Sequence, residues 1–152
     1  MERYEWSLLN HLQVGKYAEY FVKMEFTLFG FDVYTSEVDD HGVDFVVRAR
    51  ETGYYDVQVK SARVTSSSAY IFFPKELFPL RSTFLAAVVL LYQHREPELY
   101  LIPAIAWKEP NELLRDRPYD GLKSRPEWGL NISQKNAPLL APYAFSKAVV
   151  QL

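Results

Sequence analysis

The chain has 152 residues, 49% of them hydrophobic, which is enough for one domain spanning residues 1–152 whose core needs no disulfide or metal to hold it together. It has no cysteine, which excludes disulfides and thiolate zinc sites and fits the reducing cytoplasm as the expected location. Its formal net charge of −2 argues against broad, nonspecific affinity for phosphate backbones, because that affinity normally comes from a basic surface.

The first predicted element is an amphipathic helix that ends near Gly30. Its apolar positions recur at spacings of three and four residues: Val14, Ala18, Phe21, Val22, Leu28 and Phe29. On a helical wheel, Glu19 falls on the flank of this apolar stripe. Its carboxylate is therefore expected to reach the edge of the sheet that the helix covers.

Three strands are expected next, over residues 31–35, 43–47 and 54–62. Polar turns that contain glycine separate them, so the sheet should begin as an antiparallel meander. A further strand over residues 69–73 follows a run of three serines.

A run of nine apolar residues, 84–92, is too short to cross a membrane as a helix and indicates a buried strand. It does not alternate, so both of its faces should be covered. Helices are therefore expected on each side of the sheet, as in a three-layer α/β domain with a central mixed sheet. Residues 98–102 are expected to pair beside it. No secretory signal is visible at the N-terminus, and no membrane partner is expected.

The segment after Pro103 is less defined. Residues 104–115 can be helical, with Pro110 as a break, whereas residues 118–136 are rich in turn-forming and charged residues. Residues 143–150 form a closing element of ambiguous type. No internal repeat or low-complexity tract is present, so a second domain is not expected.

The polar residues of the predicted hairpin form the most informative pattern. Strand alternation sends Val57 and Val59 to one face, and Asp56, Gln58 and Lys60 to the other. Asp44 opens the preceding strand, so a carboxylate should face an amide and an amine across the hairpin.

This arrangement resembles the PD-(D/E)XK nuclease superfamily, whose core carries an acidic residue on one strand and an acid-x-Lys tripeptide on its hairpin partner. Here the tripeptide is Gln58-Val59-Lys60, a glutamine variant similar to that of Mrr-type and some homing endonucleases and of small bacterial members of the superfamily. The resemblance covers residues 13–92. Superfamily members often place a further acid on the preceding helix, and Glu19 matches it in position and order. The implied architecture is the restriction-endonuclease-like fold, a mixed sheet flanked by helices.

The resemblance implies a metal-dependent DNA endonuclease that hydrolyses phosphodiester bonds with Mg²⁺, or with Mn²⁺ as its substitute. Lys60 would orient or help to deprotonate the attacking water. A neutral amide donates less charge to the cation than a carboxylate, so metal affinity should fall unless Glu19 or Asp56 compensates. The implied metal ligands are Asp44, the Gln58 side-chain carbonyl, the Val59 backbone carbonyl and Glu19.

Other interpretations remain open. Asp44, Gln58 and Lys60 can be ordinary polar residues on a solvated strand face. The chain can also be a catalytically inactive nuclease-fold module that binds nucleic acid or a protein partner, or a partner in a toxin–antitoxin or defence system. For an endonuclease we expect DNA as the partner and a homodimer as the assembly, because duplex cleavage needs two active sites or a repositioned one.

Residues near the predicted site have simpler explanations. His41 can ligate a metal or shuttle protons, but a role in turn structure is favoured for it and for the neighbouring Asp39 and Asp40. Aromatic residues at strand spacing can stack bases, although a core position is the commoner use. These aromatic residues are Tyr54, Tyr55, Tyr70, Phe72 and Phe73.

Overall fold

The computed structural model describes residues 2–38 and 41–152. The α-helices are α1 (His11–Leu28), α2 (Ala137–Leu140) and α3 (Phe145–Ala148). The strands are β1 (Asp32–Tyr34), β2 (Phe45–Ala49), β3 (Gly53–Arg63), β4 (Ala69–Pro74), β5 (Phe84–Leu91), β6 (Glu98–Pro103), β7 (Leu114–Arg117) and β8 (Glu127–Ile132). Short 3-10 helices are η1 (Trp6–Leu8), η2 (Lys75–Leu77), η3 (Ala104–Lys108), η4 (Ala141–Tyr143) and η5 (Val149–Gln151).

The predicted first helix is present as α1. A capping box fixes its start, since the Asn10 side chain accepts from the Gln13 backbone N–H and the Gln13 side chain accepts from Asn10. Gly30 follows its end with φ of +85°. The buried stripe continues at four-residue spacing and ends at Phe26, so Leu28 and Phe29, which were expected on it, are exposed.

A central sheet of five strands in the order β1-β2-β3-β5-β6 organises the molecule. β1, β2 and β3 pair antiparallel, which confirms the predicted meander. β5 then pairs parallel with β3 and antiparallel with β6, so the sheet is mixed. Every residue of β5 is buried, as its unbroken apolar run predicts.

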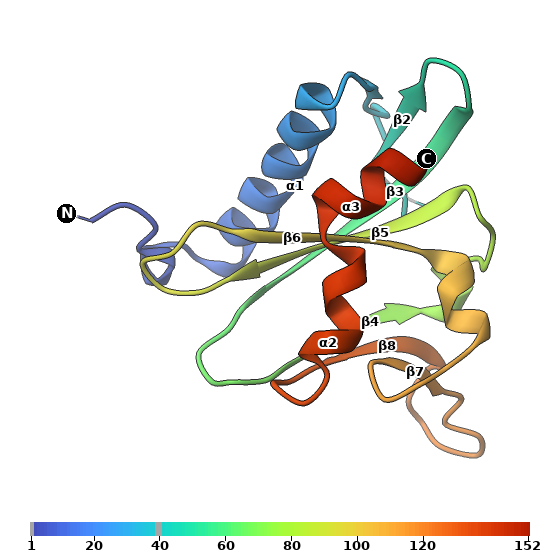
Figure 1. The fold of residues 1–152 in the computed structure, drawn as a ribbon. Helices are drawn as coiled ribbons and strands as arrows, with labels where there is room; N and C mark the ends of the chain where they lie inside the picture. The colour runs from blue at the N-terminus through green and yellow to red at the C-terminus, as the bar shows by residue number, and fades with distance from the viewer. Residues whose placement is uncertain (1, 39–40) are drawn as a thin grey trace.

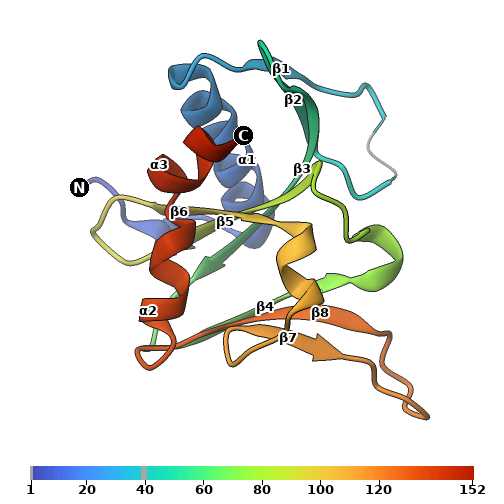
Figure 2. The same cartoon turned by 45° about the vertical axis from the view of Figure 1, so that its right-hand side comes forward.

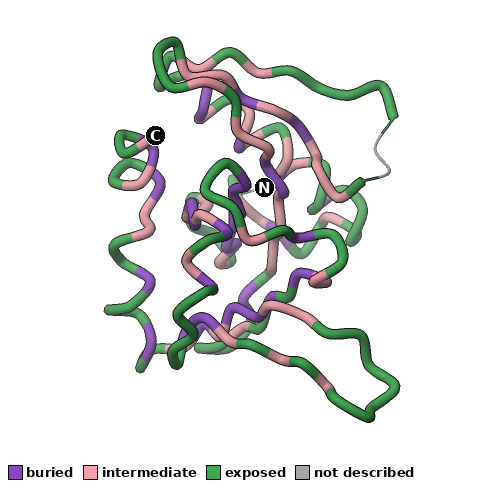
Figure 3. Tube along the Cα trace, turned by 90° about the vertical axis from the view of Figure 1, so that its right-hand side faces the viewer, coloured by how far each residue is buried: buried purple, intermediate pink, exposed green. Residues whose placement is uncertain are grey.

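Three layers are visible in Figure 2: α1 and α3, the central sheet, and a second sheet in the order β4-β8-β7. The predicted mixed α/β fold with a mixed central sheet is therefore present, with α1 on one face of the hairpin β2–β3 (Figure 1). The other face of the central sheet is covered mainly by the second sheet, where we expected helices. Figure 3 shows the buried positions in the middle of the trace and the exposed ones along its outer loops.

The second sheet arises from the segment after Pro103. The helical expectation for residues 104–115 holds only for the short η3, and β7 follows it. The turn-rich segment contains β8, which pairs with both β4 and β7. Within the described residues, no helix is long and apolar enough to cross a membrane.

Candidate functional site

Asp44 is joined to β3 through the backbone of Val59. Its Oδ2 accepts a hydrogen bond of 2.6 Å from the Val59 N–H, and its own N–H donates to the Val57 carbonyl oxygen over 2.9 Å. The N–H and C=O of one strand residue point to the same edge of the strand. The Val59 carbonyl is therefore on the edge of β3 where Asp44 lies, so two of the predicted metal ligands are neighbours.

Gln58 is buried, with 7% of its surface exposed. Val57 and Val59 pack on the side of α1, and the Gln58 side chain points to the opposite face, beside Ala86 of β5. Its Oε1 is buried and has no hydrogen-bond partner in the described part of the chain. An unpaired buried carbonyl costs about 1–3 kcal/mol, so a group that supplies a positive charge or a donor here would stabilise the protein.

Lys60 lies two residues further along β3, so its side chain leaves the strand on the same face as Gln58. It is partly buried beside the position of Val88. Its ammonium forms no salt bridge with any residue in the ranges 2–38 and 41–152. The structure thus places the Gln58 amide oxygen and the Lys60 ammonium on one strand face, as strand alternation predicts.

Glu19 is held by two lysines of its own helix. Its carboxylate oxygens lie 3.4 Å from Lys16 Nζ and 3.2 Å from Lys23 Nζ. Lys23 Nζ also lies 5.5 Å from the centre of the Phe45 ring, which packs on the side of α1. Glu19 is therefore on the α1 side of the sheet, whereas Gln58 points to the other side. The convergence of Glu19 with the hairpin residues stays a prediction.

The donor atoms at Asp44 and β3 fit a hard divalent cation. No group of three or more histidine, aspartate or glutamate residues gathers among the described residues. Asp39 and Asp40, which were considered as additions to the site, lie outside that part of the chain. Mg²⁺ is usually held by one or two carboxylates together with waters and substrate oxygens, and Asp44 with two neutral carbonyls meets that minimum.

A cavity of about 400 Å³ lies beside the segment that leads into Asp44. Its lining includes His41, Val43, Lys75 and Arg81. The backbone must pass close to η2 here, because Gly42 has φ of +75° and a side chain on it would press on Leu77. Lys75 and Arg81 become neighbours only through folding, and no sequence pattern indicated them.

Both of these cations already have carboxylate partners. Lys75 Nζ lies 2.5 Å from Asp116, and Arg81 pairs with Asp56. Asp56, which could have compensated for the neutral Gln58, is therefore engaged with Arg81. Asp44, which precedes β2, lies across from Gln58 and accepts a hydrogen bond from the Val59 N–H.

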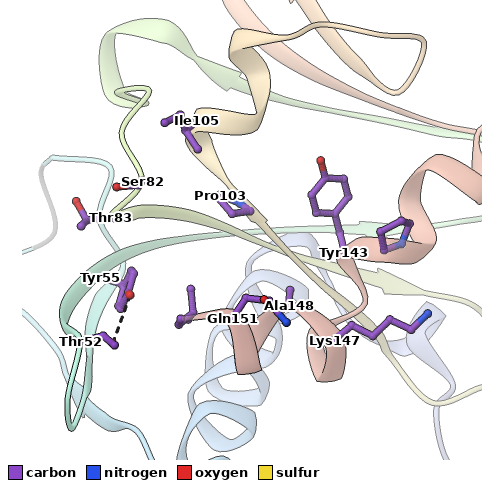
Figure 4. A pocket seen from close by; sticks show the side chains of 12 residues that line it. Thr52, Tyr55, Ser82, Thr83, Pro103, Ile105, Tyr143, Lys147, Ala148 and Gln151 are labelled. Carbon is purple, nitrogen blue, oxygen red and sulfur yellow. Dashed lines mark hydrogen bonds between the residues drawn. The ribbon is translucent and has the colours of Figure 1, made fainter.

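A larger cavity, of about 890 Å³, lies away from these residues. Four segments line it: the β2–β3 turn, the approach to β5, the β6–η3 junction and the C-terminal helices (Figure 4). Its lining includes Tyr55, Thr83, Ile105 and Tyr143. None of the predicted site residues lines it, so it does not belong to the candidate metal site.

Comparison with known proteins does not assign a function to this chain. No family model matches the sequence, and no curated protein matches it significantly. Among solved structures, the chain is similar to Hjc of Archaeoglobus fulgidus, described as a Holliday junction resolvase from an archaeal hyperthermophile. The two are 14% identical, the alignment covers 88% of this chain and 99% of that chain, and the TM-score is 0.48. The function therefore has to be argued from the site itself.

Proposed function

We propose that this protein is a metal-dependent DNA endonuclease with its active site at Asp44, Gln58, Val59 and Lys60. The observation that carries the proposal is the Gln58 side-chain oxygen, which is buried without a hydrogen-bond partner among residues 2–38 and 41–152, one residue from the Val59–Asp44 hydrogen bond. Buried polar atoms normally have a partner, and an unpaired one calls for an explanation. A bound divalent cation would provide that partner.

The roles follow from the chemistry of the side chains. Asp44 supplies the negative charge, and the Gln58 and Val59 carbonyls supply neutral oxygens to the ion. Mg²⁺ bound there would polarise the scissile phosphoryl group and lower the pKa of a bound water. Lys60 would orient the attacking water and stabilise negative charge as it develops on the phosphate. Glu19 would hold a second ion or a metal-bound water if α1 brings it to the hairpin edge.

The test is cleavage of supercoiled, linear, branched and single-stranded DNA with Mg²⁺ or Mn²⁺. Lys60→Ala should abolish cleavage without unfolding the protein, while Lys147→Ala, an exposed lysine without a described partner, should cleave like the parent. Asp44→Asn keeps a carbonyl that can accept from the Val59 N–H, but it removes the negative charge. It should therefore weaken metal binding, and excess Mn²⁺ should restore cleavage. Equal cleavage by the parent and both site variants would exclude this site.

A second candidate function is a noncatalytic module that binds nucleic acid or a protein. Two observations favour it: Gln58 is neutral, and Glu19 is paired with Lys16 and Lys23. Among the described residues, Asp44 then supplies the negative charge beside Gln58 without help from Asp56, which pairs with Arg81. A calorimetric titration with Mn²⁺ separates the two functions. Binding of Mn²⁺ that is weakened in Asp44→Asn supports the enzyme, and absence of Mn²⁺ binding supports the module.

We also propose that the enzyme is a homodimer, because cutting both strands of a duplex region needs two active sites or a repositioned one. Light scattering measures the mass of the protein alone and with DNA. A monomer under both conditions would restrict the activity to nicking.

A further inference from the structure

Two exposed tyrosines and a partly buried arginine form a cluster on the β1–β2–β3 meander. Tyr34 and Tyr54 are 45% and 57% exposed, and their ring centres lie 6.3 Å apart. The Arg48 guanidinium lies 5.5 Å from the centre of the Tyr34 ring and 5.9 Å from that of Tyr54. We call these three residues the stacking platform.

Arg48 is held in place by its neighbours on both sides. Its Nη2 and Nε donate to one Asp32 oxygen over 2.6 and 3.2 Å, and its Nη1 lies 3.5 Å from the Tyr54 hydroxyl. The bond to Asp32, and then the one to Tyr54, raises the pKa of the Arg48 guanidinium above its usual value. The platform therefore presents a fixed, charged guanidinium plane between two rings.

The platform shares a strand face with the candidate site. Val33, Val47 and Tyr55 pack toward α1, so the residues that alternate with them lie on the opposite face. Arg48 and Tyr54 are direct cross-strand partners on that face, and Gln58 follows Tyr54 by four residues. That separation is about 13 Å along the strand at 3.3 Å per residue.

The second sheet does not cover the part of this strand face that carries Arg48 and Tyr54. Figure 2 shows β1 and β2 at the opposite end of the molecule from β4, β8 and β7. The exposed fractions of Tyr34 and Tyr54 agree with this arrangement. The platform is therefore open to a ligand from solvent.

We propose that the stacking platform binds unpaired bases of a single-stranded DNA segment and leads its backbone along β3 to Asp44 and Gln58. The proposal rests on the proposed nuclease function, and it specifies the substrate as DNA with an unpaired segment, such as a flap, a loop or a single strand. At a rise of 3.4 Å per nucleotide, about four stacked nucleotides cover the 13 Å from Tyr54 to Gln58.

The charges of the protein favour stacking over phosphate binding as the source of affinity. The net charge is −2, and Arg48 is already paired with Asp32. Aromatic rings and guanidinium planes stack on any base, because every base has a π-face. We therefore expect binding that depends on the rings and changes little with salt, with a slope of log affinity against log salt of about −1 to −2.

The test measures binding of a fluorescein-labelled oligothymidylate by anisotropy in EDTA, so that cleavage plays no part. Tyr34→Ala and Tyr54→Ala should each weaken binding about 5- to 100-fold, the usual effect of removing one stacked ring. Tyr54→Phe should bind nearly as well as the parent, because it keeps the ring. The matched control is Tyr20→Ala: Tyr20 is 58% exposed on α1 with Lys16 and Lys23 at 5.7 and 5.8 Å, and its loss should change nothing.

The outcomes separate this proposal from the function on which it rests. One outcome is that the protein cleaves DNA, but the parent, Tyr34→Ala and Tyr54→Ala bind the oligonucleotide equally well. This outcome would overturn the platform and keep the nuclease. Ring-dependent binding without cleavage would keep the platform and replace the nuclease by a binding module. An equal loss in Tyr20→Ala, or tighter binding of blunt duplex than of the single strand, would also overturn the platform.

Discussion

Gln58 shows how a residue can serve a site at a cost to the fold. Its buried Oε1 has no partner in the part of the chain that the structure describes, and leaving such an atom unpaired costs about 1–3 kcal/mol. Methionine has nearly the same shape and no carbonyl. We expect Gln58→Met to raise the free energy of unfolding in EDTA by about 1 kcal/mol and to weaken Mn²⁺ binding. Urea denaturation measures the first effect and calorimetry the second. A less stable Gln58→Met protein would mean that the amide already has a partner in the folded chain.

Tyr70 gives a prediction for alkaline pH. Burial, and then the hydrogen bond of 2.5 Å to Glu127, raises the pKa of Tyr70 to about 12 from a usual value of 10. The folded state therefore holds this proton more tightly than the unfolded state does. The resulting stability is complete below pH 10 and is lost as the pH rises through 12. An ultraviolet titration follows the ionisation of the tyrosines. We expect the titration of Tyr70→Phe to lack one phenol that ionises near pH 12. If the variant and the parent gave the same titration near pH 12, Tyr70 would ionise at a different pH.

The candidate site was predictable at the level of strand alternation and no further. Val57, Gln58 and Lys60 take the faces that a period of two requires. The hydrogen bond from Val59 to Asp44 was not predictable, because it depends on β2 beginning at Phe45. Nor could sequence show that lysines one helical turn away would bind Glu19, since many such pairs stay apart in water.

At the scale of elements, β4 and β8 form an antiparallel pair in which the Tyr70 side chain lies across Gly129. A methyl group on Gly129 would overlap the Tyr70 hydroxyl and ring. Gly129→Ala should therefore displace Tyr70, break its bond to Glu127 and lower the free energy of unfolding by about 1 kcal/mol. In a Tyr70→Ala background the same change should cost little. A double-mutant cycle by urea denaturation measures this coupling, and additive effects would contradict the proposed contact.

The meander was easier to predict than the second sheet. Residues 43–47 and 54–62 are rich in β-branched and aromatic residues and meet at a glycine turn, so their pairing is local. β8 follows Pro126 and contains Gly129, and both residues weaken a strand signal. Its alternating Trp128, Leu130 and Ile132 become meaningful only when β4 supplies the partner, more than fifty residues earlier.

At the scale of the whole molecule, Trp107 joins the two sheets. It lies in η3, between β6 of the central sheet and β7 of the second. Its Nε1 donates to the Gly129 carbonyl over 2.9 Å, and its ring meets Phe73 and Phe78 edge-on at 5.7 and 5.3 Å. The core between the sheets is therefore continuous, and the single domain stays a prediction.

This continuity predicts one cooperative unfolding transition for both sheets. Trp107→Ala should lower the free energy of unfolding by about 3–5 kcal/mol, because it leaves a large cavity and an unpaired carbonyl. Since the two sheets share that core, native-state hydrogen exchange at Val88 of β5 and Leu130 of β8 should report the same opening free energy, and both should fall by the same amount in the variant. If Leu130 alone lost protection, the second sheet would be a separate folding unit and the single-domain prediction would be wrong.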